Sequence, residues 1–143
     1  MNYFTSINTH SKFNDVALLL VRLFVGFAML SHGFPKLQML LSGEEIKFFS
    51  FLGLGAKFSL GLTVFAEFVC SIFIILGLFT RWAAFFLFFT MAVAALFIHG
   101  SDPFDKREMS LLYLFIYLLI LAFGPGKFSV DGMVSQRREN SGW

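Results

Sequence analysis

The chain has few charged residues and a single cysteine. Lys, Arg, Asp and Glu make up 14% of its 143 residues, and the formal net charge is only +2. No basic run is longer than the pair Arg137 and Arg138, so nucleic acid is not expected as a partner. Because Cys70 is the only cysteine, the sequence also excludes an internal disulfide and a Cys-x-x-Cys redox pair.

Apolar residues are present in great excess. They account for 57% of the chain, and Phe alone supplies 22 residues. This composition is typical of a protein that crosses a membrane several times, with membrane lipid as its partner. Residues 1–15 are polar and only mildly basic, and no small-residue cleavage site follows the first apolar run. We therefore expect that run to be a retained span.

Four apolar segments organise the chain. They predict helices over residues 16–41, 58–79, 82–98 and 103–123, the last beginning at an Asp-Pro pair typical of a helix start. The fold class is therefore an all-α membrane protein, an antiparallel four-helix transmembrane bundle over residues 1–131 with a polar cytoplasmic tail over residues 132–143. The positive-inside rule favours cytoplasmic termini by one residue.

Several polar residues fall at helix ends that meet at one membrane face. Four antiparallel spans place the end of helix 1, the start of helix 2, the end of helix 3 and the start of helix 4 together. The residues expected to gather at one end, whatever the orientation of the chain, are His32, Lys36, Lys57, His99, Asp102 and Glu108.

Two formal charges lie deeper in the predicted spans. Arg22 and Glu67 would each cost about 2.5–3.5 kcal/mol at a helix centre on insertion scales. We expect them to form a buried ion pair that fixes the register of helices 1 and 2. A second interpretation, compatible with the first, makes Glu67 a proton-exchanging or ligand-facing carboxylate, because ionisable groups within a membrane are functional candidates.

The polar cluster predicts a ligand site more readily than a metal or haem site. Two histidines near helix ends are more typical of interfacial caps than of axial haem ligands, and no metal site is expected. A quinone fits the same atoms, since an imidazole or a lysine can donate to its carbonyl oxygen while a carboxyl group carries the proton. The alternative is a solvated collar of helix-end side chains, with Lys36 as a snorkelling anchor. The predicted ligand-binding residues are His32, Lys36, Glu67, His99 and Glu108.

Several stretches resemble the DoxX family of small bacterial inner-membrane proteins. The resemblance covers nearly all of residues 18–131 and is carried by "RLFVGFAMLSHGFPKL", "AEFVCSIFIILGLFTR" and "GPGKFSVD". It implies a four-helix topology and an inner-membrane location. The family's motif positions fall on Arg22, His32, Gly33, Lys36, Glu67, Gly77, Arg81, Gly124, Pro125, Gly126 and Asp131.

The resemblance also implies a redox association, because some members are described as membrane subunits of oxidoreductases that exchange electrons with quinone. We therefore expect a quinone- or lipid-soluble-ligand-interacting subunit of an oxidoreductase assembly, with redox partner subunits or a homo-oligomer as partners and no autonomous catalytic centre. Two alternatives stay open: a small-solute or proton pathway along the polar stripe of helices 1 and 2, and a structural partner of another membrane protein.

Overall fold

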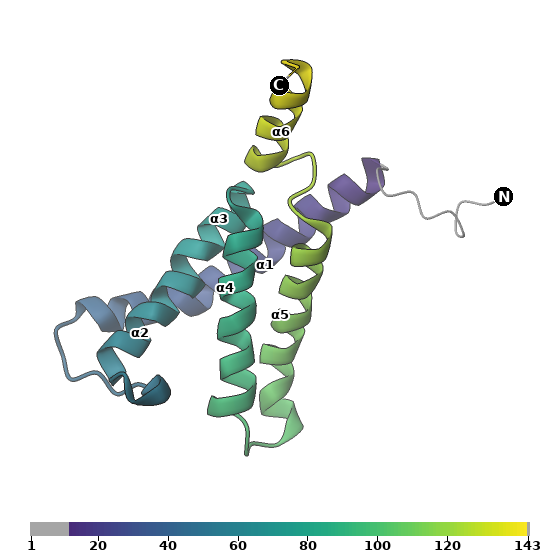
Figure 1. The fold of residues 1–143 in the computed structure, drawn as a ribbon. Coiled ribbons are helices and arrows are strands. Elements are labelled where there is room, and N and C mark those ends of the chain that lie inside the picture. Colours follow the sequence, from purple (N-terminus) through teal and green to yellow (C-terminus); the bar gives the residue numbers. More distant parts are fainter. Residues whose placement is uncertain (1–11, 143) are drawn as a thin grey trace.

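The computed structural model describes residues 12–142, which form an all-α protein (Figure 1). Two π-helical segments, η2 and η3, continue the helices that precede them. The elements in chain order are α1 (Lys12–Leu41), a 3-10 turn η1 (Phe51–Gly53), α2 (Ala56–Val64), η2 (Phe65–Cys70), α3 (Ser71–Leu76), α4 (Thr80–Val93), η3 (Ala94–Ile98), α5 (Phe104–Phe123) and α6 (Val130–Asn140). Helices α4 and α5 lie side by side and antiparallel, and α1 packs against the continuous helix from α2 to α3.

Three of these helices are long and apolar enough to cross a membrane. They are Lys12–Leu41, Ala56–Leu76 and Thr80–Ile98. The predicted fourth span, α5, is not among them, because every stretch of 18 residues within it contains Lys106, Arg107 and Glu108. The structure thus agrees with the prediction of several membrane spans. Helix length and composition support three of the four predicted spans.

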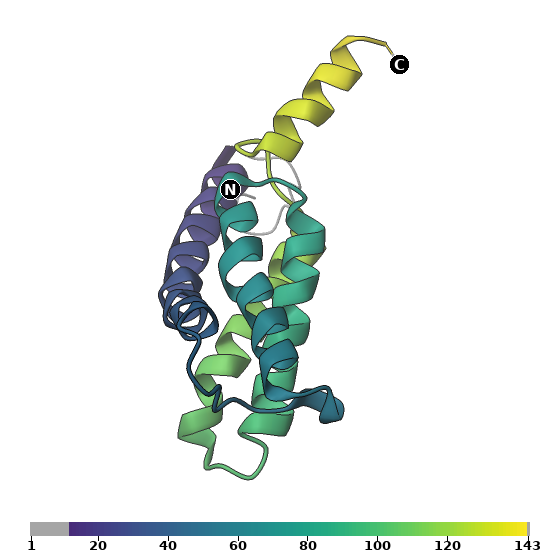
Figure 2. The same cartoon turned by 90° about the vertical axis from the view of Figure 1, so that its left-hand side faces the viewer.

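The helix bounds differ from the predicted ones at both ends of the chain. Helix α1 already begins at Lys12, and it continues through Pro35 to Leu41. At the other end, the predicted polar tail contains the helix α6, which projects away from the bundle (Figure 2). The Ser129 hydroxyl caps this helix by accepting a hydrogen bond from the Gly132 amide at 2.9 Å. The part of the N-terminal prediction that concerns residues 1–11 lies outside the described residues.

The bundle core is narrow. Its fully buried side chains include Val25 on α1, Ile74 on α3, Leu87 on α4 and Tyr117 on α5. Most phenylalanines lie on the outer surface, where a soluble protein would carry polar residues. This reversal is the pattern expected of helices that face lipid on one side and one another on the other side.

Two glycines allow α1 to lie very close to the helix formed by α2, η2 and α3. A Cβ atom added to Gly33 would stand 2.8 Å from both the backbone carbon and the carbonyl oxygen of Glu67. One added to Gly26 would collide with the Ile75 side chain. The close approach that small residues permit between membrane helices is thus realised along α1.

The loop after α5 is tied to the opposite side of the bundle by Arg22. The guanidinium group of Arg22 donates hydrogen bonds to the carbonyl oxygens of Pro125, at 2.6 Å, and Phe128, at 2.8 Å. The amide of Lys127 donates to the carboxylate of Asp15 at 3.1 Å. The beginning of α1 therefore holds residues 124–129 from two positions.

Asp131 completes this end of the molecule, which we call the Arg22 end. Its carboxylate accepts hydrogen bonds from the amides of Phe79, at 3.0 Å, and Thr80, at 2.8 Å, and so caps the start of α4. Its own amide donates to the carbonyl oxygen of Gly77 at 2.9 Å. Gly77 has φ +69, a backbone conformation that favours glycine, and a Cβ there would collide with Ser129.

The contact at Gly33 predicts a strong difference between two glycine substitutions. Gly33→Ala places a methyl group against the backbone of Glu67, which cannot move aside as a flexible side chain would, so we expect the free energy of unfolding to fall by about 1–3 kcal/mol. Gly61→Ala is the matched control, because nothing lies within 4 Å of a Cβ at that helical position. Thermal unfolding in detergent measures both variants. Equal melting temperatures for the two would contradict the close approach of the helices.

Candidate functional site

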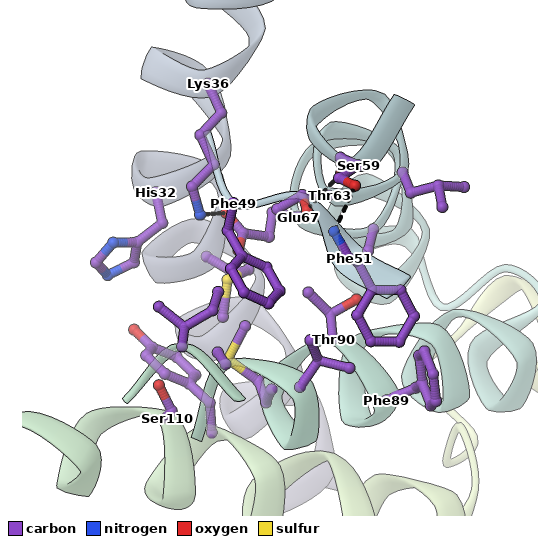
Figure 3. A pocket seen from close by; sticks show the side chains of 18 of the residues that line it. His32, Lys36, Phe49, Phe51, Ser59, Thr63, Glu67, Phe89, Thr90 and Ser110 are labelled. Carbon is purple, nitrogen blue, oxygen red and sulfur yellow. Dashed lines mark hydrogen bonds and ion pairs between the residues drawn. The ribbon is translucent and has the colours of Figure 1, made fainter. Parts of the chain in front are cut away.

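A cavity of about 670 Å³ opens at the end of the bundle opposite the Arg22 end. Its walls come from the second half of α1, from α2 and η2, from α4 and η3, and from the start of α5 (Figure 3). Residues 48–51 of the loop between α1 and α2 supply three further phenylalanine side chains. The lining is largely apolar, with a small number of polar groups, which is the composition of small-molecule sites.

Lys36 and Glu67 form an ion pair in the wall of this cavity. The Nζ atom of Lys36 lies 2.5 Å from Oε2 of Glu67, and the two side chains point toward each other from facing helices (Figure 3). The Glu67 side chain is only 5% exposed, whereas that of Lys36 is 30% exposed. The pair therefore places a nearly buried carboxylate next to an ammonium group that still faces the cavity.

The predicted ion pair between Arg22 and Glu67 is wrong. Arg22 binds backbone carbonyl oxygens at the other end of the molecule, and Glu67 binds Lys36 instead. The reason is the position of each residue along the bundle axis. The contact of Gly33 with the Glu67 backbone fixes the level of Glu67 on α1. Lys36 is less than one turn beyond that point, whereas Arg22 is about 16 Å away along the helix axis at 1.5 Å per residue.

The two predicted histidines lie at the cavity, in different surroundings. The ring of His32 is exposed and meets Tyr113 edge-on, with 6.0 Å between ring centroids. His99 follows η3, and its Nδ1 lies 2.8 Å from Oδ2 of Asp102. This hydrogen bond holds the pKa of the Asp102 carboxyl below its usual range.

Four of the five predicted ligand-binding residues line the cavity, namely His32, Lys36, Glu67 and His99. Glu108 does not: the residues of α5 that line the cavity are Met109 together with Lys106, Ser110 and Tyr113, which recur at helical spacing. The spacing of these three residues by four and three is the helical period, so their shared face was readable from the sequence. The alternating direction of successive spans correctly placed Glu108 at this end of the bundle. That alternation does not determine which way a side chain points.

The phenylalanines of the loop were not predicted to take part. Phe51 packs edge-on against Phe89 of α4 and Phe97 of η3, with centroid distances of 6.2 and 6.0 Å. Its amide donates to the Ser59 hydroxyl at 2.9 Å, which fixes the loop to α2. An irregular loop has no periodicity, so no sequence signal pointed to this aromatic wall.

Both π-helical segments border the cavity. Glu67 is part of η2, and η3 contributes Ala94 and Ile98 immediately before His99. A π-helical turn inserts one residue into a helix and so turns the following side chains relative to the preceding ones, and such turns are frequent at functional sites. Helical wheels drawn with 3.6 residues per turn cannot anticipate this rotation.

The arrangement suits a molecule with a small polar head and an apolar body. Lys36, His32 and Lys106 offer donors and positive charge, and Glu67 offers a carboxylate. The hydroxyl groups of Thr63 and Thr90 donate to carbonyl oxygens of their own helices, at 2.9 and 2.8 Å. Within residues 12–142 no group of three or more His, Cys, Asp or Glu side chains is placed to hold a metal ion.

The ion pair predicts an asymmetric double-mutant cycle. Lys36→Met leaves the nearly buried Glu67 carboxylate without its partner, so we expect a loss of about 3 kcal/mol in the free energy of unfolding. Glu67→Gln costs less, because the more exposed Lys36 can extend toward water. The double variant should cost much less than the sum of both.

Thermal unfolding in detergent of the two single variants and the double variant measures this coupling. The control cycle combines Arg22→Met with Glu67→Gln, whose effects should add because the two side chains do not meet. Additivity in the first cycle and coupling in the control cycle would show that the pairing described above is wrong.

Comparison with known proteins agrees with the resemblance seen in the sequence. The DoxX family model matches residues 17–100, which include the cavity residues of α1, η2 and η3. An uncharacterized protein of Haemophilus influenzae (strain ATCC 51907 / DSM 11121 / KW20 / Rd) is 33% identical over 135 residues, covering 87% of this chain and 96% of the other. No solved structure gives a significant match. The family match spans more than half of the chain, and the chain therefore belongs to the DoxX family.

Proposed function

We propose that this chain binds the head of a lipid-soluble, quinone-like molecule in its cavity and acts as a membrane subunit of an oxidoreductase assembly. The observation that carries the proposal is the Lys36–Glu67 ion pair in the wall of a largely apolar cavity between candidate spans. An ion pair whose role was only to fix the helix register could equally well lie in a helix interface without a cavity. Here the ammonium group remains accessible from the cavity.

The polar groups have the chemistry that a quinone head needs. A quinone carbonyl oxygen accepts hydrogen bonds, which the Lys36 ammonium and a neutral His32 imidazole can donate. Reduction of a quinone also requires protons, and a carboxyl group such as Glu67 is a suitable proton carrier at a membrane site. In this proposal the electrons come from a partner subunit, and the chain supplies binding and proton exchange.

The apolar part of the cavity faces the direction from which a lipid-soluble molecule would arrive. Phe65 on η2 and Phe86 and Phe89 on α4 line the cavity, yet all three are more than 40% exposed on the outer surface. They lie near the middle of their helices, at the depth of the hydrocarbon core. A long apolar tail can therefore remain in the lipid between α2 and α4 while the head reaches Lys36.

We further propose that α5 is the fourth span and that the chain lies in the bacterial inner membrane with both termini cytoplasmic. Helix α5 runs along α4, and its uncharged residues 109–123 cover about 22 Å at 1.5 Å per residue (Figure 1). Long side chains such as Lys106 and Arg107 can extend toward the membrane surface. The count of positive charges that favours cytoplasmic termini includes Arg22 on the cytoplasmic side and Lys36 on the opposite side. Both residues lie inside a span, and leaving both out keeps the surplus of one positive charge on the cytoplasmic side.

Photo-crosslinking with an azido-quinone tests the proposed ligand. In the intact protein we expect label on cavity-lining peptides, competed by excess unlabelled quinone. We expect Lys36→Met to reduce the label by about tenfold, because it removes a charged hydrogen-bond donor. Lys57→Met is the control, since Lys57 lies at the same end of the bundle but lines a different hollow. Label confined to the outer phenylalanines and equal in both variants would contradict the proposal.

A further inference from the structure

Three polar atoms are buried between the cavity and the Arg22 end without a hydrogen-bond partner. They are Oη of Tyr117, Oγ of Ser71 and Nε of Arg22, and no acceptor or donor of the described chain satisfies them; Oγ1 of Thr80 at the start of α4 and Nε of Arg107 are also unpartnered but lie outside this interval. Tyr117 and Ser71 are 0% exposed and Arg22 is 1% exposed. Unsatisfied buried polar groups are rare because desolvation without a new hydrogen bond costs free energy, so such groups commonly bind internal water.

These atoms follow one another along the bundle. Ser71 is one turn beyond Glu67, and Tyr117 is one turn beyond Tyr113, so each lies one step from the cavity wall toward the Arg22 end. The Ser71 carbonyl group lies against Gly26, which is itself one turn from Arg22 on α1. Ser71 and Tyr117 therefore lie one turn inward from the cavity wall, whereas the guanidinium group of Arg22 extends farther, to Gly77.

The spacing suits bridging water molecules. Four residues of helix correspond to about 6 Å at 1.5 Å per residue. A water molecule that makes two hydrogen bonds of about 2.8 Å joins groups roughly 5.5 Å apart. The hydroxyl groups of Ser71 and Tyr117 can each donate and accept, whereas Nε of Arg22 only donates, so water can satisfy all three.

We propose that Tyr117 and Ser71 hold a short file of bound water molecules that extends inward from Glu67 toward the Arg22 end. This goes beyond ligand binding, because it gives the Glu67 carboxylate a hydrogen-bonded connection into the interior of the bundle, away from the cavity mouth.

X-ray radiolytic footprinting of the intact protein tests the proposal directly. Hydroxyl radicals form wherever water lies, so a side chain that is 0% exposed is modified only if bound water touches it. After correction for intrinsic reactivity, we expect Tyr117 to be modified severalfold more than Leu87 and Ile120, which are equally buried and wholly apolar. Modification of Tyr117 no higher than that of Leu87 and Ile120 would overturn the water file.

Thermal unfolding of Tyr117→Phe provides a second readout that depends on no reactivity scale. If water binds the hydroxyl group, its removal breaks satisfied hydrogen bonds and lowers the melting temperature. If the hydroxyl group is dry, its removal relieves an unsatisfied polar group and raises the melting temperature, which overturns the proposal. Thr90→Val calibrates the effect, because it removes a hydroxyl group whose hydrogen bond lies within its own helix and involves no water file. Both experiments are made without quinone, so neither outcome depends on the identity of the cavity ligand.

Discussion

A carboxylate inside a membrane-spanning helix must be neutralised or solvated, and much of this structure follows from how Glu67 meets that requirement. Its partner is Lys36, which reaches it from the end of α1. The pairing requires α1 to lie close to η2, and Gly33 makes this possible because no side chain intervenes at the contact with the Glu67 backbone. The same contact sets the depth at which α1 crosses, and it leaves room beyond Gly33 for the cavity.

The polar side chains at the two ends of the bundle have different kinds of hydrogen-bond partner. At the Arg22 end, Arg22 and Asp131 satisfy backbone carbonyl and amide groups of the chain itself, which fixes the loop after α5 and the start of α4. At the cavity end, the polar side chains converge without consuming all of their hydrogen-bonding capacity on the backbone. The structure thus has one end closed by hydrogen bonds to the backbone and one end that opens into the cavity.

The sequence predicted the four long helices and the end of the bundle at which the cavity lies, because these depend on apolar length and on the alternating direction of successive helices. It also named Lys36 and Glu67, which the structure places in the wall of the cavity. Their pairing was missed because the depth of a side chain depends on the contact at Gly33, which is a tertiary feature. Glu108 does not line the cavity, because it lies off the face of α5 that points inward. The helical spacing of the residues on that face already indicated this in the sequence. The aromatic wall around Phe51 and the rotation introduced by η2 carry no sequence signal of their own.

The account stands on Glu67 being an ionised carboxylate held by Lys36 within the cavity wall. Infrared difference spectroscopy of the reconstituted protein at neutral pH measures this charge directly. Subtracting the spectrum of Glu67→Gln from that of the unaltered chain should reveal the absorption of an ionised carboxylate. In the Lys36→Met background the carboxylate absorption should shift, because the ammonium group that binds Oε2 of Glu67 is gone. A protonated Glu67 in the unaltered chain would contradict the account, and so would a carboxylate absorption that is the same with and without Lys36.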